Sequence, residues 1–142
     1  MNDRVFLDTN IFVYAVDSSN GSKSSAASQL IRNTLRTRKG VVSYQVIQEF
    51  FNVVLRRFAK PMNLQDAERY FETTLRPLLS VHSSENLYRS ALRLFGARGL
   101  AWYDSLIVAA ALESECTVLY SEDFQHGRNY GDLKIHNPFL SV

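Results

Sequence analysis

The sequence predicts an α/β fold in which helices cover both faces of a central parallel sheet. Short apolar and β-branched runs alternate along the chain with segments whose apolar residues recur at helical spacing. This alternation indicates parallel strands, because a parallel crossover needs a helix to return the chain. The length of 142 residues is that of one ordinary domain, so we expect a single domain over residues 1–142.

The amino-terminal part of the chain is predicted to form a strand followed by a helix. Residues 4–7 are strand-like, and residues 11–16 continue the apolar character. A polar loop is predicted over residues 17–25, which contain Asn20-Gly21 and a series of serines. The helix that follows ends at Lys39-Gly40. Its apolar positions are Ala27, Leu30, Ile31 and Leu35.

The middle of the chain is predicted to contain two helices. A brief strand at residues 41–42 precedes a helix over about residues 44–60, which Pro61 ends. Asn63 can cap the second helix, whose apolar residues run from Leu64 to Leu75 and which Pro77 ends.

The last part of the chain continues the alternation of strands and helices. Residues 78–82 are strand-like, and the spacing of apolar residues over 87–95 predicts a helix. Residues 106–112 are apolar on every side, which predicts a buried helix. A strand over residues 117–120 and a short one over residues 133–135 complete the predicted sheet.

Composition sets the broad class of the protein. Hydrophobic residues make up 46% of the chain and charged residues 21%, which is typical of a globular protein. The net charge of +2 is too small to indicate nucleic-acid binding by itself. Cys116 is the single cysteine, so no internal disulfide can form. No apolar run approaches the ~20 residues that span a bilayer, and no secretory signal is evident, so we expect a cytoplasmic protein without a membrane anchor.

Acidic side chains follow or precede the most apolar segments. Asp8 and Asp123 come after predicted strands, where open α/β sheets bind ligands. Asp104 opens the most hydrophobic helix, and Glu49 lies beside the apolar seam of its own helix. If these carboxylates converge, they need a cation, because each like charge raises the cost of ionising the next. Oxygen ligands favour Mg²⁺ or Mn²⁺ over zinc.

Each acid also has a simpler structural interpretation. Asp8 or Thr9 could cap a helix, and Asp104 could be the acid of a first helical turn. Glu49 could be a solvated helix residue, and Glu122-Asp123 could form a turn. Both interpretations remain open from the residue pattern alone.

Several segments resemble the PIN-domain family, and in particular VapC-type ribonuclease toxins of bacterial toxin–antitoxin pairs. The similar segments cover nearly the whole chain in the family's order. They are LDTNIFVYA, QEFFNVV, WYDSLIVAAAL, VLYSEDFQHG and IHNPF. The resemblance implies a three-layer α/β/α fold with a central parallel sheet. It also implies Mg²⁺- or Mn²⁺-dependent cleavage of single-stranded RNA, with 5′-phosphate and 3′-hydroxyl products.

The resemblance assigns roles to individual residues. The family's four acids, which are catalytic and hold the metal, correspond to Asp8, Glu49, Asp104 and Asp123. Glu122 adjoins Asp123, so either of the two can face the metal. Asn10 and Ser121 match polar positions that orient the acids, and Thr9 with Asn10 would hold the turn of Asp8.

The resemblance further implies a homodimer and a tight complex with an antitoxin protein. Aromatic residues of the middle helices exceed what one small core needs, so some should be exposed to a partner. They are Phe50, Phe51, Phe58, Tyr70 and Phe71.

The residues that contact RNA are not fixed by the sequence, but candidates can be named. Basic clusters that could bind phosphates, or simply be solvated helix faces, are Arg32, Arg36, Arg38 and Lys39; Arg56, Arg57 and Lys60; and Arg89 with Arg93. Aromatic residues that could stack on bases, or belong to the core, are Tyr14, Tyr44, Trp102 and Tyr103. His82, His126 and His136 indicate no triad.

Two other functions compete with the nuclease interpretation. One is a non-catalytic PIN-like module that binds RNA or acts as a scaffold, although the complete set of acids argues against it. The other is a phosphoacceptor receiver domain, which needs a lysine beside its acidic pocket. Lys134 is the only lysine in the carboxyl-terminal third, which makes this interpretation weak.

Overall fold

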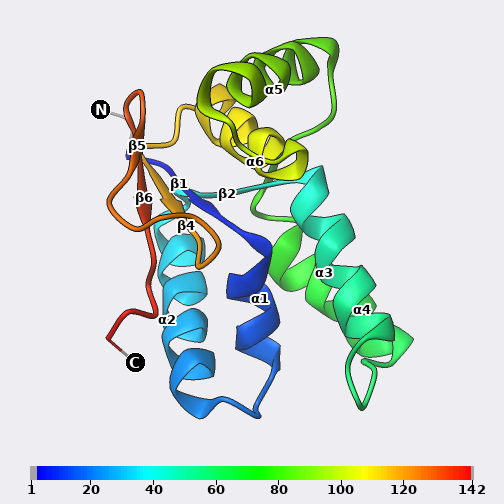
Figure 1. Cartoon of the computed structure of the whole chain (residues 1–142). Helices are drawn as coiled ribbons and strands as arrows, with labels where there is room; N and C mark the ends of the chain where they lie inside the picture. Colours follow the sequence, from blue (N-terminus) through cyan, green and yellow to red (C-terminus); the bar gives the residue numbers. More distant parts are fainter. Residues whose placement is uncertain (1–2, 142) are drawn as a thin grey trace.

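The structure is a computed structural model that describes residues 3–141. Its strands and helices alternate along most of the chain (Figure 1). Their order is β1 (Val5–Leu7), α1 (Thr9–Val16), α2 (Gly21–Thr37), β2 (Gly40–Ser43), α3 (Tyr44–Arg56), α4 (Leu64–Tyr70), the π-helical turn η1 (Phe71–Leu75), β3 (Leu79–Val81), α5 (Glu85–Arg98), α6 (Trp102–Glu113), β4 (Val118–Tyr120), β5 (Asn129–Tyr130) and β6 (Leu133–His136).

The strands form one sheet in the order β3-β2-β1-β4-β6-β5. All neighbouring strands are parallel except β5, which pairs antiparallel with β6. β1 lies near the centre, where Phe6 pairs with Val41 of β2 and with Leu119 of β4. The predicted α/β fold with a mostly parallel sheet is therefore confirmed. Because β1 is a central strand, its last residue lies near the middle of one edge of the sheet.

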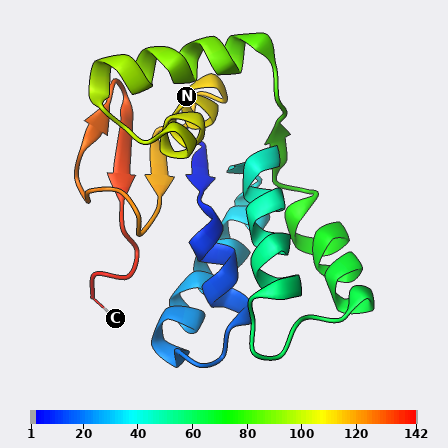
Figure 2. The same cartoon turned by 45° about the vertical axis from the view of Figure 1, so that its right-hand side comes forward.

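Helices lie on both sides of the sheet. α5 and α6 pack on each other on one side, whereas α1 and α2 pack on each other on the other side (Figure 1). α1 continues directly from β1 and also contacts α3, so it lies between α2 and α3 (Figure 2). Within residues 3–141, no helix is both long enough and apolar enough to span a bilayer.

The core lies between these layers. It contains side chains of β1 such as Phe6 and Leu7, which are completely buried. α6 is buried along residues 105–111, as its apolar sequence predicts, because it packs between the sheet and α5. Gly40 of β2 is required by close packing, because a Cβ there would lie 2.7 Å from Leu78 and from Thr34.

Two predicted boundaries are wrong, and each has a local cause. α3 ends at Arg56 rather than near Lys60. Pro61 disfavours helical geometry at Lys60 and would clash with the carbonyl four residues earlier, so the helix ends well before the proline. The predicted loop over residues 17–25 is shorter, because the Asn20 side chain caps α2 by accepting from the Lys23 amide.

The helix α1 is left open by the sequence pattern, which indicates only apolar character over residues 11–16, and two further elements were missed. β5 is only two residues long, and it is joined to β6 through Gly131, whose φ of 62° suits a tight turn. The helix capped by Asn63 ends in the π-helical turn η1 before Pro77. The remaining predicted strands and helices are confirmed, with ends shifted by one to a few residues.

Candidate active site

The four predicted acids gather beyond the carboxyl ends of the strands, although each comes from a different element. Asp8 follows β1, Glu49 lies on α3, Asp104 lies in the first turn of α6, and Asp123 follows β4. Burial is the largest cause that raises the pKa of Asp8 and the pKa of Asp104, and charge repulsion from Asp123 and Glu49 raises both pKa values further. The fold therefore brings these carboxylates close enough to repel one another.

Asp8 is the buried member of the group, with 5% of its surface exposed. Its Oδ1 accepts a hydrogen bond of 2.8 Å from the Thr9 amide, so Asp8 is also the N-cap of α1, as the alternative interpretation predicts. Its Oδ2 accepts a hydrogen bond of 2.6 Å from the Ser121 hydroxyl. Desolvation outweighs these hydrogen bonds and, with repulsion from Asp123 and Glu49, raises the Asp8 pKa to about 7.

Glu49 is held by two hydrogen bonds that tie α3 to its neighbours. The Thr9 hydroxyl donates to Glu49 Oε1 at 2.7 Å, and Gln45 Nε2 donates to Glu49 Oε2 at 3.3 Å. Gln45 Nε2 also lies 3.2 Å from the carbonyl of Tyr103, next to Asp104. Thr9 and Gln45 thus connect Glu49 with α1 and with the start of α6, and the role expected for Thr9 extends beyond its own turn.

Asp104 and Asp123 are the less constrained acids. Among residues 3–141, the side chain of Asp104 has no hydrogen-bond or ion-pair partner, and burial followed by repulsion from Asp123 and Glu49 raises its pKa. Asp123 is exposed, yet partial desolvation followed by repulsion from Glu122 and Glu49 raises its pKa. The Asp123 amide donates to Ser121 Oγ at 3.1 Å, which fixes the backbone of this turn.

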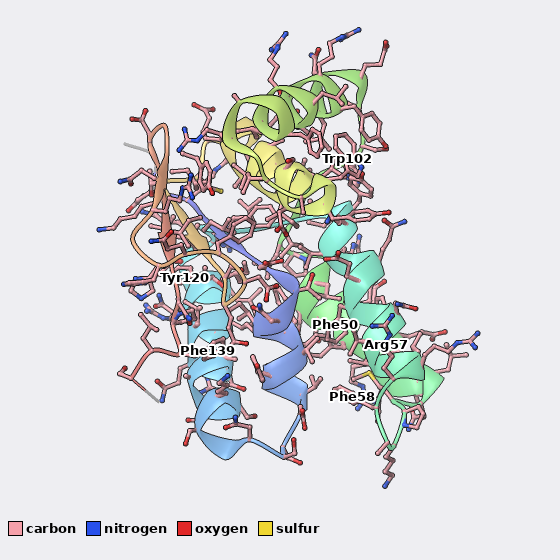
Figure 3. All side chains as sticks on the ribbon, in the orientation of Figure 1. Phe50, Arg57, Phe58, Trp102, Tyr120 and Phe139 are labelled. Atoms are coloured by element: carbon pink, nitrogen blue, oxygen red, sulfur yellow. The ribbon has the colours of Figure 1, made fainter. Side chains whose placement is uncertain are left out.

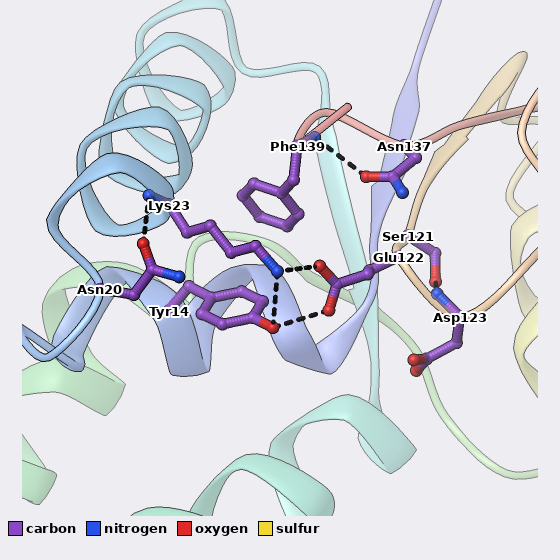
Figure 4. Close-up of polar contacts among 8 residues, drawn as sticks. All are labelled: Tyr14, Asn20, Lys23, Ser121, Glu122, Asp123, Asn137 and Phe139. Carbon is purple, nitrogen blue, oxygen red and sulfur yellow. Dashed lines mark hydrogen bonds and ion pairs between the residues drawn. The ribbon is translucent and has the colours of Figure 1, made fainter. Parts of the chain in front are cut away.

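Glu122 faces a different neighbourhood from Asp123 (Figure 4). Its carboxylate forms an ion pair of 2.5 Å with Lys23 of α2 and accepts a hydrogen bond of 2.7 Å from the hydroxyl of Tyr14. These contacts lower the pKa of Glu122 despite its partial burial. Glu122 is therefore already neutralised by a cation of the protein, whereas Asp123 lies with the other acids.

Asn10 has an unusual environment beside these carboxylates. Both atoms of its side-chain amide are buried, and neither has a hydrogen-bond partner among the described residues. Asn10 nevertheless has a looser hydrogen-bonding contact with the Asp123 carboxyl, which lowers the pKa of Asp123. A buried amide without a partner is costly, so its position indicates a site that becomes complete when a ligand or water binds.

A cavity of about 470 Å³ opens beside the acids. Its walls come from α1, α3, the residue after α3 and the turn after β4. The lining residues are Thr9, Asn10, Val13, Tyr14, Glu49, Asn52, Val53, Arg57 and Asp123. Arg57 follows the last residue of α3 (Figure 3), whereas Glu49 lies in the middle of this helix. Of the basic residues named from the sequence, Arg57 is the one that lines this cavity.

The chemistry of the donors fits a hard divalent cation. The gathered ligands are carboxylate oxygens, and within residues 3–141 no Lys or Arg forms an ion pair with any of the four acids. As they stand, no three Asp, Glu, His or Cys side chains of the described part are close enough together to hold one ion. The unpartnered carboxyl of Asp104 and the unpartnered amide of Asn10 are the groups left for a ligand.

Other candidate residues lie outside this cluster. Lys39 pairs with Asp3, and Arg89 pairs with Glu85 on α5. Tyr14 is bound to Glu122, and Tyr103 is 65% exposed at the start of α6. The Lys134 backbone pairs with Val118 at the beginning of β4, whereas the acids follow the opposite ends of the strands. Lys134 is therefore not beside the acidic cluster, and the receiver-domain interpretation is wrong.

The aromatic residues of the middle helices are less exposed than the sequence suggests. Phe50 is completely buried, and Phe51, Phe58, Tyr70 and Phe71 are half-buried. Phe51 and Phe71 line an open apolar cavity of about 370 Å³ between α3 and α4, together with Leu55 and Leu64. The most exposed apolar side chains near this cavity are leucines rather than aromatic residues, and Leu64 is 70% exposed.

A model of one protein family matches most of the chain. The PIN domain model matches residues 5–131, which contain all four acids. No curated protein matches the sequence.

Several solved structures share this fold at low sequence identity. A toxin–antitoxin complex from Klebsiella pneumoniae has a TM-score of 0.68 and 15% identity, over 95% of this chain and 98% of that chain. VapC20 from Mycobacterium tuberculosis, a toxin that cleaves the sarcin–ricin loop, has a TM-score of 0.60 and 17% identity, over 84% of this chain and 89% of that chain. VapBC2 from Rickettsia felis, bound to promoter DNA, has a TM-score of 0.64 and 17% identity, over 94% of this chain and 97% of that chain.

Proposed function

The chain belongs to the PIN domain family, and on that basis we propose that it is a metal-dependent endoribonuclease that cleaves single-stranded RNA. The observation that carries this proposal is the convergence of Asp8, Glu49, Asp104 and Asp123 from four elements, where burial, followed by charge repulsion, raises three of their pKa values. The proposal includes the role of toxin in a toxin–antitoxin pair, as in the similar complexes from Klebsiella pneumoniae and Rickettsia felis.

We assign the four acids to the binding of Mg²⁺, or alternatively Mn²⁺. Asp123 is chosen over Glu122, because Glu122 is already paired with Lys23. Asp104 has no side-chain hydrogen bond within the described residues, and among them only Asn10 interacts by hydrogen bonding with the Asp123 carboxyl, so both acids have oxygens that can turn toward an ion. When bound, such an ion supplies a more acidic water and a positive charge beside the reacting phosphate.

The protein's own residues fix the position of the ligands. Ser121 and Thr9 bind the two oxygens of Asp8, which prevents rotation of this buried carboxylate. Thr9 also holds Glu49, so a single residue sets the spacing between two acids. Asn10, with its unpartnered amide, is placed to donate to a bound water or phosphate oxygen. These contacts support preorganisation of the site before substrate arrives.

Proton transfer needs a carboxylate whose oxygens are not already committed. Both oxygens of Asp8 and of Glu49 accept hydrogen bonds, whereas Asp104 accepts none within the described residues and Asp123 interacts only with Asn10. Asp104 or Asp123 is therefore the group that accepts a proton from the attacking water. Attack on the phosphorus with loss of the 3′ oxygen leaves products with a 5′ phosphate and a 3′ hydroxyl.

The partners proposed for the toxin are an antitoxin protein and a second copy of the chain. The apolar cavity between α3 and α4 suits a hydrophobic segment of an antitoxin, because Leu55 and Leu64 leave apolar surface exposed at its edge. A second apolar surface lies on α5, where Tyr88, Leu92 and Phe95 follow helical spacing and are 42%, 58% and 50% exposed. We assign the α5 surface to the homodimer.

The direct test is cleavage of a 5′-labelled single-stranded RNA by the purified protein. We expect cleavage with Mg²⁺ or Mn²⁺, its loss in EDTA, and its recovery when the cation is restored in excess. Phosphatase and kinase treatment of the fragments should show a 5′ phosphate and a 3′ hydroxyl. Full activity in excess chelator would contradict the metal assignment. Binding of RNA without cleavage under any of these conditions would favour a non-catalytic RNA-binding or scaffold module.

A further inference from the structure

Arg57 joins two cavities on the same side of the molecule. One is the cavity beside the acids, which Arg57 lines together with Glu49 and Asp123. The other has a volume of about 540 Å³ and lies between the turn after α1 and the segment after α3. Its lining residues are Val16, Asp17, Ser18, Ser19, Arg57, Phe58, Ala59 and Lys60. Because Arg57 lines both, the two cavities adjoin at its side chain, and together we call them the groove along α1 and α3.

The position of Arg57 relative to Glu49 is set by the helix. Residues 49, 53 and 57 recur every four positions and all line the first cavity, so they lie on one face of α3 and its last turn. Eight residues of helix correspond to about 12 Å along the axis. Arg57 is therefore too far along the helix to share a ligand with Glu49, but it lies on the path that a bound strand would take.

The guanidinium of Arg57 is available for a ligand. Among residues 3–141 it forms no side-chain hydrogen bond or ion pair, whereas Arg76 and Arg89 pair with the acids four residues before them. A cation near the carboxyl end of a helix is favourable in itself, which accounts equally for Arg56 and Arg57. The two residues differ in position, since Arg57 lines both cavities and Arg56 lines neither. The favourable effect of the helix end does not explain this difference.

We propose that Arg57 binds a backbone phosphate of single-stranded RNA next to the phosphate that is cleaved, so that the strand lies in the groove along α1 and α3. The proposal rests on the nuclease function proposed above and assigns a substrate contact to it. A strand whose reacting phosphate lies at the carboxylates must place a neighbouring phosphate farther along the groove, and a guanidinium binds phosphate oxygens in pairs. Asn52 and Lys60 line the groove on either side of Arg57 and add polar and cationic contacts.

The test compares Arg57→Gln with Arg56→Gln, which removes the same charge one position away. Binding of a short fluorescein-labelled single-stranded RNA of mixed sequence is measured by anisotropy in EDTA, where the RNA stays intact. We expect Arg57→Gln to weaken binding roughly tenfold, the effect of losing one charged hydrogen-bonded contact. We also expect the slope of log K against log salt to fall by about 0.7, the value for one phosphate of a single strand. Arg56→Gln should match the parent in both measurements.

Each outcome of this comparison decides the proposal. Equal affinity and equal salt slope for the two variants would overturn the role of Arg57, while RNA cleavage by the parent would leave the nuclease function standing. Absence of both RNA binding and RNA cleavage by the parent would overturn both. If Arg57→Gln reduced binding of a labelled oligoglutamate peptide but not of RNA, the groove would be a protein-binding site, and the proposal would be wrong. Circular dichroism melting curves of the two variants should coincide, since both side chains are exposed.

Discussion

The hydroxyl of Ser121 donates a hydrogen bond of 2.6 Å to the carboxylate of Asp8, although the two residues are 113 positions apart in the sequence. The contact exists because β1 and β4 are parallel neighbours, so both strands end at the same edge of the sheet. Ser121 is completely buried, so the hydrogen bond is shielded from water. It ties the most buried acid of the site to the turn that carries Asp123.

Ser121→Ala should therefore weaken cation binding without removing a ligand. The variant loses the donor that stabilises the ionised form of Asp8, so the Asp8 pKa rises further above its ordinary value. We expect the Mg²⁺ concentration for half-maximal RNA cleavage to rise about tenfold or more. Ser114→Ala, which alters a buried serine at the far end of α6, is the matched control and should leave this concentration unchanged. Equal values for the two variants would remove Ser121 from the site.

Asp104→Asn should abolish RNA cleavage while the protein stays folded. The change removes a charge that has no partner in residues 3–141, so the repulsion on Asp123 and Glu49 falls and stability does not decrease. We expect cleavage to fall by at least about 100-fold, as for the loss of a catalytic acid or base. Glu113→Gln, at the other end of α6, should cleave as the parent does. Parental activity in Asp104→Asn would show that Asp104 is not part of the site.

The metal-free protein should become less stable relative to its Asp8→Asn variant as the pH rises from about 4 to about 7. The Asp8 carboxyl has a pKa of about 7 in the folded protein and an ordinary value of 3.8 otherwise. Between these values the folded state holds a proton that the unfolded state has lost, so raising the pH favours unfolding. Above pH 7 both states are ionised and the effect is constant, on the order of 4 kcal/mol.

This effect is measured by urea unfolding in EDTA at several pH values. Asp8→Asn removes the titrating group, so the difference in unfolding free energy between variant and parent reports the titration of Asp8. Contributions from acids with lowered pKa values, such as Glu122, are the same in both proteins and cancel. A difference that does not change between pH 4 and pH 7 would mean that Asp8 titrates normally. Excess Mg²⁺ should reduce the difference, because it favours the ionised carboxylate.

The positions of the acids were predictable from the sequence, but their orientations were not. Asp8, Asp104 and Asp123 adjoin apolar segments. The rule that ligands bind at the carboxyl ends of strands therefore predicted that these acids lie near one another. Glu122 and Asp123 are consecutive residues in a turn, so no periodicity tells which one faces inward. In the structure Glu122 pairs with Lys23, which lies 99 positions away in the sequence and cannot be found from any local pattern.

The same limit applies to the fold. Apolar spacing predicted the helices and strands because it records which face is buried, and the buried α6 is the clearest case. The end of α3 depends on steric exclusion by Pro61, which acts several residues before the proline itself. β5 is too short for alternation to be detected, and only the glycine-containing turn before Leu133 could have indicated a hairpin.

Leu92→Arg should convert the proposed dimer into a monomer. Leu92 is 58% exposed at the centre of the α5 surface formed with Tyr88 and Phe95, and an arginine there would bury an unpaired charge in a symmetric contact. Light scattering at micromolar protein concentration measures the change. Leu140→Arg, at an equally exposed leucine in the carboxyl-terminal segment, should remain dimeric. A monomeric parent would contradict the dimer and leave the nuclease proposal intact.

Leu64→Arg should instead weaken inhibition by the antitoxin, the protein expected to be encoded beside this gene. Leu64 is 70% exposed at the rim of the apolar cavity between α3 and α4, where Glu68 adds negative charge and Glu72 is paired with Arg76. An antitoxin segment with apolar and basic side chains would fit both features, and the arginine would remove apolar contact and repel the basic groups.

In a cleavage assay titrated with antitoxin, the parent should be inhibited at near-stoichiometric ratios and Leu64→Arg only at a large excess. Leu92→Arg should be inhibited like the parent, because its surface is separate. If saturating antitoxin left cleavage by the parent undiminished, the toxin role would be wrong, whereas equal inhibition of all three proteins would place the antitoxin on another surface.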